Sequence, residues 1–191
     1  MANYALQPTQ GGALVCNPHL SPGVVELALG RLRAMTLSYI LGQAGWATVT
    51  ISHDTQRLEM NASYLSDSLP EMTQAAICLL EGADSVRFFF EDEPGEHRCI
   101  VCRTGDSEAK IRILWFDDCA GFPDERGSEV FFCTCSIARF CGEVLACLQR
   151  LLDEHGVDGY KQKWVEHDFP TERLERLRGL VRKRYEQKSS A

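Results

Sequence analysis

The chain has 191 residues, of which 45% are hydrophobic and 25% are charged. A chain of this length and composition can bury a core of its own, which excludes a disordered, collagen-like or coiled-coil protein as the main state. The formal net charge of -7 disfavours nucleic acid as the main target, because binding phosphate groups requires basic surfaces. An acidic protein instead suits a protein partner with a basic surface.

Targeting signals and cysteines indicate the compartment. The longest apolar runs, such as FFF and ILWF, are far shorter than the roughly 20 residues that span a bilayer as a helix, so we expect no membrane segment. The start of the chain, MANYALQPTQGGALVC, has no basic segment followed by an apolar one, which predicts no secretory export and a cytoplasmic location. The nine cysteines are odd in number and lie mostly in apolar stretches, so we expect buried, reduced thiols.

The N-terminal part of the chain is predicted to form two segments. Residues 1–20 are rich in Gly, Pro, Gln and Asn and have little periodicity, which indicates a flexible leader. Residues 21–45 form the next segment, and its pattern predicts a helix over 21–42 with Ser21 at the N-cap and Pro22 in the first turn. The apolar face of this helix would pack on the main body or join two copies as a homodimer.

Residues 46–188 are predicted to form a single α+β domain that begins with a hairpin and a helix. TVTISH and RLEMNASYL alternate apolar and polar residues on either side of DTQ, which is typical of a hairpin. SDSLPEMTQAAICLLEGAD predicts a helix with Ser68 and Glu71 in a capping box and Gly82 at its end.

Four further strands and two helices follow in the sequence. SVRFFFE, HRCIVCR, AKIRILWF and SEVFFCTCS are rich in β-branched and aromatic residues and are separated by turn formers. IARFCGEVLACLQRLLDEHG then predicts a long helix that Gly156 closes. An aromatic linker, which should lay Tyr160, Trp164 and Phe169 over the edge of the core, leads to a last helix in TERLERLRGLVRKRYEQK.

The order of these elements predicts the fold class. Strands that come in blocks indicate an α+β fold, with an antiparallel meander sheet of about six strands packed against helices and an extra N-terminal helix. A split sheet with helices at one end is the alternative.

The pair Cys99 and Cys102 in HRCIVCR resembles a metal-binding or redox motif. In a strand, however, residues three apart point to opposite faces of the sheet, so the two thiols cannot bind one metal ion there. Cys133 and Cys135 do share a face, which leaves open a metal- or thiol-dependent enzyme or regulator as an alternative. We interpret the cysteines as core residues and predict no cofactor and no metal site.

Other signatures of catalysis are missing from the sequence. The five histidines have no metal-ligand spacing, and there is neither a phosphate-binding glycine motif nor a Gly-x-Ser-x-Gly elbow. His167 stands between two carboxylates but has no recognisable nucleophile beside it. We therefore assign no catalytic residue and favour a non-enzymatic protein.

Two acidic segments follow the first and the third strand of the predicted meander. Because antiparallel strands alternate in direction, the turn after the first strand and the loop after the third emerge at the same end of the sheet. Their carboxylates should therefore lie together and form a surface for a basic partner or a cation, although solvated turn residues are the plainer interpretation. The predicted binding residues are Glu91, Asp92, Glu93, Glu96, Asp117, Asp118, Asp124 and Glu125.

The sequence from YLSDSLPEMTQAAICLLEGADSVRFFFEDEPGEHRC through ILWFDD to GYKQKWVEHDFP resembles small bacterial α+β proteins that serve as immunity proteins of polymorphic toxin systems. The resemblance covers roughly residues 48 to 184, excludes the N-terminal helix and transfers no functional residue. It implies a protein that binds and neutralises a toxin. A structural module that dimerises through residues 21–42 is a further alternative.

Overall fold

The computed structural model describes residues 34–119, 121–165 and 167–189. These residues form seven strands, three α-helices and one short 3-10 helix. The strands are β1 (Thr36–Leu41), β2 (Trp46–His53), β3 (Gln56–Ser63), β4 (Ser85–Asp92), β5 (Gly95–Arg103), β6 (Glu108–Phe116) and β7 (Ser128–Ser136). The helices are α2 (Ser68–Leu80), η1 (Asp124–Arg126), α3 (Ile137–Trp164) and α4 (Thr171–Ser189).

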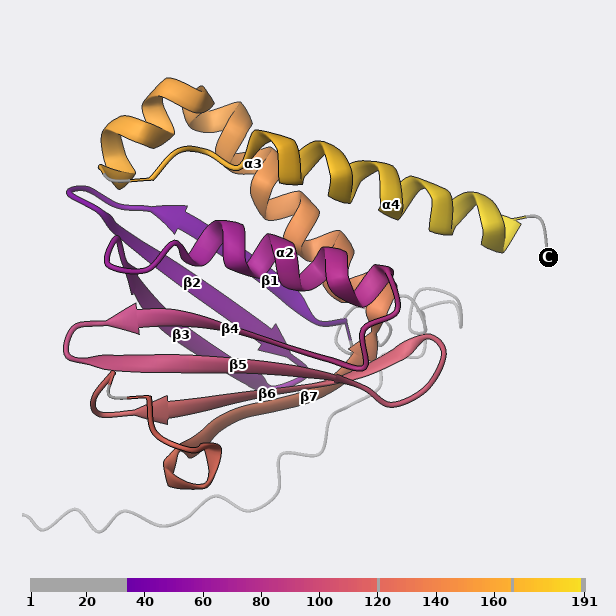
Figure 1. Ribbon diagram of the computed structural model, residues 1–191, viewed down its shortest axis with the longest axis horizontal. Coiled ribbons are helices and arrows are strands. Elements are labelled where there is room, and N and C mark those ends of the chain that lie inside the picture. The colour runs from indigo at the N-terminus through magenta and orange to yellow at the C-terminus, as the bar shows by residue number, and fades with distance from the viewer. Residues whose placement is uncertain (1–33, 120, 166, 190–191) are drawn as a thin grey trace, which may run out of the picture. The chain divides into compact units, whose positions relative to one another are not determined.

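The strands form two antiparallel sheets, which confirms the α+β class but not the single meander of about six strands. One sheet has the order β1-β2-β3 and the other the order β4-β5-β6-β7. Figure 1 shows α2, α3 and α4 together on one side of the strands. Helix α2 packs against β4 and α3 packs against β1, so the helices connect the edges of the two sheets. The expectation of a split sheet with helices at one end is thus closer to the observed arrangement.

The strand that the sequence pattern missed is β1. We predicted a helix over 21–42, but Thr36–Leu41 pairs with β2 in an antiparallel ladder, and residues 1–33 lie outside the described part of the chain. Leu37, Tyr39 and Leu41 point into the core, and Ile40 points outward. The apolar residues of TLSYIL therefore serve the sheet and cannot form the C-terminal end of a helical dimer face.

Helix α2 forms where predicted, but its first turn differs from the predicted capping box. Asp67 occupies the N-cap position and makes no capping hydrogen bond with its side chain. The Ser68 hydroxyl instead lies 3.0 Å from the Tyr39 hydroxyl in the buried interior. The Ser68 side chain, which the sequence pattern assigned to the capping box, therefore makes a tertiary contact to β1.

Helix α3 is longer than predicted. Gly156 has a non-helical backbone (φ 65°, ψ -179°), but the chain resumes helical geometry after this kink and continues to Trp164. The segment predicted as a linker is thus partly helical, while Tyr160, Trp164 and Phe169 are buried in the core as expected. Among the described residues, no helix is long and apolar enough to cross a membrane.

The four-stranded sheet has a core face and an outer face. Alternation along β5 places Cys99 and Val101 in the main core, whereas Ile100 belongs to a small cluster on the outer face with Leu114 and Phe116. Cys102 packs against this outer cluster. The prediction that the Cys-x-x-Cys pair lies in a strand with its thiols on opposite faces is therefore confirmed.

The burial of Trp164 makes it a test of the core. Its side chain is fully buried, and its ring lies 6.2 Å from that of Tyr39 and 6.3 Å from that of Tyr160. Replacing Trp164 with Ala should lower the free energy of unfolding by about 3 to 5 kcal/mol, because the substitution leaves a large cavity. Urea denaturation followed by circular dichroism measures the change. Trp46→Ala, at a position 36% exposed, is the matched control, and an equal loss in the two variants would contradict the assignment.

Candidate functional site

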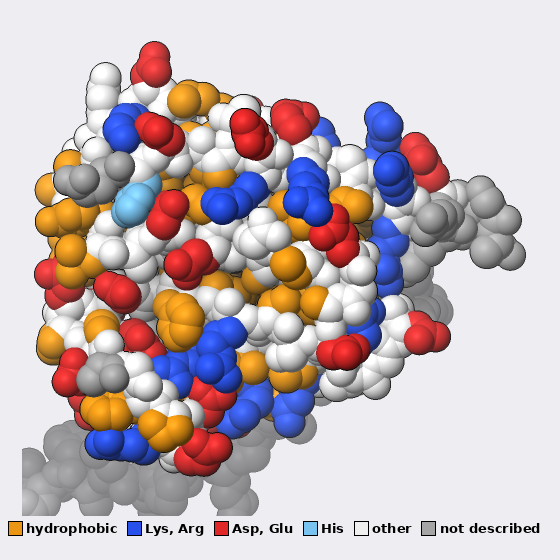
Figure 2. Space-filling view, in the orientation of Figure 1, with side chains coloured by type: hydrophobic (Ala, Val, Ile, Leu, Met, Phe, Trp, Pro, Cys, Tyr) orange, Lys and Arg blue, Asp and Glu red, His pale blue; other side chains and the backbone are white. Residues whose placement is uncertain are grey.

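The two acidic segments lie at the same end of the four-stranded sheet, which we name the acidic end (residues 91–96 and 117–125). In Figure 1 the β4–β5 turn and the β6–β7 connection both lie on the left, and Figure 2 shows acidic side chains over this region. The Cys119 thiol links the segments, since its Sγ lies 3.4 Å from the Pro94 carbonyl oxygen and 3.3 Å from that of Gly95. The antiparallel strand order therefore brings the segments together as expected.

The carboxylates of the acidic end differ in their exposure. Asp92 is half-buried, and its carboxylate accepts hydrogen bonds from the Asn61 amide at 3.2 and 3.3 Å. Glu91 stands opposite Glu96 in the β4–β5 ladder, and its pKa is raised by partial burial and by the charges of Glu96 and Glu93. Burial is the larger cause of this shift, and the neighbouring carboxylates add repulsion to it. The exposed members are Glu93, Asp117, Asp118 and Glu125.

Two of the predicted binding residues form ion pairs with arginines of the same chain, which the acidic pattern did not reveal. Arg98, which is 3% exposed, donates to Glu96 Oε1 through Nη2 at 2.6 Å and through Nε at 3.1 Å. Its Nη1 donates to Asp124 Oδ1 at 2.7 Å and to the Phe122 carbonyl oxygen at 2.6 Å. Arg87 binds the other oxygen of Asp124 at 2.7 Å. Glu96 and Asp124 therefore have their charges balanced within the chain.

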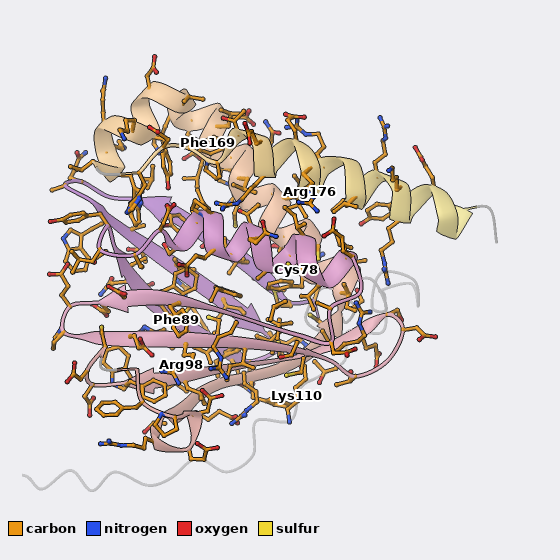
Figure 3. All side chains as sticks on the ribbon, in the orientation of Figure 1. Cys78, Phe89, Arg98, Lys110, Phe169 and Arg176 are labelled. Atoms are coloured by element: carbon orange, nitrogen blue, oxygen red, sulfur yellow. The ribbon has the colours of Figure 1, made fainter. Side chains whose placement is uncertain are left out.

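The Arg98 guanidinium also lies against aromatic rings on the outer face. Its Cζ is 4.1 Å from the centroid of Phe116 and 5.5 Å from that of Phe89. Figure 3 shows Arg98 and Phe89 on neighbouring strands of the four-stranded sheet. Rings and ion pairs together surround a buried cation, which satisfies the rule that a buried charge needs partners. This cluster holds the β6–β7 connection against the sheet.

A cleft of about 340 Å³ opens beside this connection. Aromatic side chains form much of its wall, and two exposed carboxylates, one arginine and Ser128 line the rest. The residues concerned are Trp115, Phe116, Phe122, Asp117, Asp118 and Arg126. The cleft therefore brings apolar ring faces and two of the predicted binding residues into one concave surface.

Two glycines allow the rings of this cleft to pack closely. A Cβ on Gly95 would overlap the ring of Trp115, and one on Gly127 would lie 2.5 Å from the ring of Phe116. The Trp115 indole is fixed further by a hydrogen bond of 2.7 Å from its Nε1 to Asp117 Oδ1. Trp115 lies half-buried at the wall of the cleft.

His97 is a buried titratable residue that the sequence analysis did not single out. It is 7% exposed, and its ring lies 4.6 Å from that of Trp115. Its Nδ1 has no hydrogen-bond partner among the described residues. Burial lowers the pKa of His97 to about 4, although the charge of Asp92 opposes the shift. The imidazole is therefore neutral at physiological pH.

The alternative of a metal- or thiol-dependent site depends on how the described Cys, His, Asp and Glu side chains are grouped and on the surroundings of the thiols. In these ranges no group of three His, Cys, Asp or Glu side chains is arranged to hold a metal ion. Burial raises the pKa of Cys99, and it raises the pKa of Cys141 and of Cys147 to about 12. A raised pKa leaves little thiolate at neutral pH, which disfavours a nucleophilic role for these three residues.

Comparison with known proteins adds one structural similarity. The sequence matches no family model and no curated protein. A chain of the CdiA-CT/CdiI toxin and immunity complex from Enterobacter cloacae is similar over 60% of this chain and 99% of that chain, with a TM-score of 0.40 and 8% sequence identity. A TM-score this low does not establish a common fold, so binding by this chain has to be inferred from its own residues.

The Arg98 cluster predicts a large stability effect from a single substitution. Arg98→Ala should lower the free energy of unfolding by about 3 to 5 kcal/mol, because it leaves the buried carboxylate of Glu96 without a partner. Arg112→Ala on the neighbouring strand is the control, since the Arg112–Glu129 pair is exposed and its loss should cost about 1 kcal/mol or less. Urea denaturation of both variants measures the difference, and similar losses would refute the structural role of Arg98.

His97 predicts how stability changes with pH. The pKa of His97 falls from an ordinary value of 6.5 to about 4 in the folded chain, so the folded state resists protonation of this ring. The free energy of unfolding should therefore keep its full value above pH 6.5 and decrease as the pH falls towards 4. On acidification, the free energy of unfolding of His97→Phe should decrease by roughly 2 to 3 kcal/mol less than that of the wild type. Urea denaturation at neutral and acidic pH measures the loss for the wild type and the variant. His155→Phe is the control, and an unchanged pH dependence in His97→Phe would contradict the prediction.

Proposed function

We propose that the protein is a non-enzymatic protein-binding protein that binds a basic partner at the acidic end. The observation that carries the proposal is the shared position of the cleft and the exposed carboxylates of both acidic segments. Electrostatic attraction from such a surface accelerates association with a basic partner, and ring faces in a concave wall supply contact area. Glu96 and Asp124 are not part of this surface, because Arg98 and Arg87 compensate them.

The partner class that we propose is a toxin with a basic surface. The sequence resemblance to immunity proteins of polymorphic toxin systems supports this class, and the negative charge of the acidic end is consistent with it. Covering the basic active-site surface of a nuclease-like toxin would neutralise it without any catalysis by this chain. Purifying the product of a neighbouring gene and measuring its binding tests the class. A product that does not bind would contradict the class, and a product that binds away from the acidic end would contradict the proposed surface.

The proposed surface can be tested with a synthetic peptide of alternating arginine and glycine as a basic probe. Glu93→Lys combined with Asp118→Lys should leave the circular dichroism spectrum unchanged and weaken binding roughly tenfold at low salt, because repulsion replaces attraction. The difference should shrink as salt rises, since both residues are exposed and therefore screened. Isothermal titration calorimetry measures both effects.

A control pair of substitutions with the same change in net charge shows whether the peptide binds at the acidic end or is attracted by the total charge of the protein. Asp106 and Glu108 are exposed in and beside the β5–β6 turn, at the opposite end of the same sheet. Asp106→Lys combined with Glu108→Lys should weaken peptide binding much less than the pair at the acidic end. Equal weakening by the two pairs would mean that the peptide senses only total charge, and the proposed surface would be wrong.

A further inference from the structure

We propose that the aromatic cleft at the acidic end binds an arginine side chain of the partner, and that Arg126 of the chain itself covers part of this cleft until the partner displaces it. This inference rests on the proposed function, because it names the group that the same site would recognise. It predicts that the cleft prefers arginine to lysine, which attraction between opposite charges alone would not produce.

The first support is that guanidinium groups already lie on the rings of this region. The Cζ of Arg98 is 4.1 Å from the centroid of Phe116, and the Cζ of Arg126 is 3.8 Å from that of Phe122. A planar guanidinium can stack on a ring face while its edge donates to carboxylates, which the compact ammonium group of lysine cannot do in the same way. The cleft supplies both kinds of contact through Phe122 and through Asp117 and Asp118.

The second support is the contrast between the two arginines. Arg98 is buried and held by two carboxylates, so it belongs permanently to the fold. Arg126 is exposed, and the structure records its stacking on Phe122 but no ion pair for it within the described ranges. A side chain held by one exposed cation–π contact gains little from that contact and is readily replaced. A partner arginine that reaches Asp117 or Asp118 as well would displace it.

The third support is the rigidity of the wall. Trp115 is fixed by its hydrogen bond to Asp117 and by the close approach of Gly95, and Phe116 is held between Arg98 and Gly127. A preformed wall requires little ordering when a side chain enters, which favours binding. The cleft therefore has the properties of an anchor position, with a rigid aromatic wall and carboxylates at its edge.

The test uses N-acetyl-arginine amide, N-acetyl-lysine amide and the uncharged N-acetyl-citrulline amide as probes of the full chain. The reporter is the indole N–H resonance of Trp115, assigned with Trp115→Phe and followed by NMR during titration. Arginine amide should shift this resonance at lower concentration than lysine amide, and citrulline amide should shift it least. Equal shifts by arginine and lysine amides would overturn the proposal, because they would show attraction between charges without stacking.

Variants separate the roles of Phe122 and Arg126. Phe122→Leu should weaken binding of arginine amide by about two- to fivefold, the range for an exposed cation–π contact, and Arg126→Ala should tighten it by a similar factor. Arg57→Ala is the control, since it removes the same charge from β3 in the other sheet. Tightening by Arg57→Ala as large as that by Arg126→Ala, or weaker binding in Arg126→Ala, would refute self-occupancy of the cleft.

The peptide experiment distinguishes failure of this inference from failure of the proposed function. If peptide binding depends on Glu93 and Asp118 but not on Phe122, the acidic end is a binding surface and the arginine cleft is wrong. If arginine amide perturbs Trp115 as expected but the peptide ignores Glu93 and Asp118, the cleft is a site for a small cation and the proposed protein-binding surface is wrong.

Discussion

The acidic end depends on one buried cation. Arg98 projects from the outer face of β5, where it would be costly to bury without partners, and it recruits Glu96 from its own strand and Asp124 from the β6–β7 connection. The bond to the Phe122 carbonyl oxygen adds a backbone contact to the same connection. A long loop that has little secondary structure of its own thereby acquires a fixed position, and the position of the cleft wall follows from it.

The sequence predicted local features better than it predicted contacts between distant segments. The period of two in HRCIVCR correctly placed Cys99 and Cys102 on opposite faces. The same reasoning failed for TLSYIL, because a short apolar run satisfies a strand and a helix equally well, and only pairing with β2 decides between them. At Gly156 the pattern located the kink, but it could not show that tertiary packing of Tyr160 and Trp164 continues the helix beyond it.

The candidate site was predictable in its location but not in its composition. The alternating direction of antiparallel strands was enough to predict that the two acidic segments lie at one end of the sheet, because they follow the first and the third strand. Which carboxylates are paired within the chain and which are exposed depends on Arg98. Its contact with Asp124 could not be predicted from local sequence, because 26 positions separate the two residues. The sequence signal that was available is Glu96 two positions before Arg98, because residues two apart in a strand share a face and these two carry opposite charges.

The buried charges of the acidic end stabilise the fold, and its exposed charges are the ones available to a partner. The Arg98–Glu96 pair is almost completely shielded from water, so dissolved ions screen it weakly, whereas Glu93 and Asp118 are exposed and screened within about 10 Å at moderate salt. Salt should therefore reduce attraction to a partner while the loop keeps its position. Because the hydrogen bond and ring contacts that support the wall involve neither Glu93 nor Asp118, substitutions at these two residues can change partner preference without unfolding the surface that carries them. Asp117 differs from both, since its bond to the Trp115 indole ties it to the wall itself.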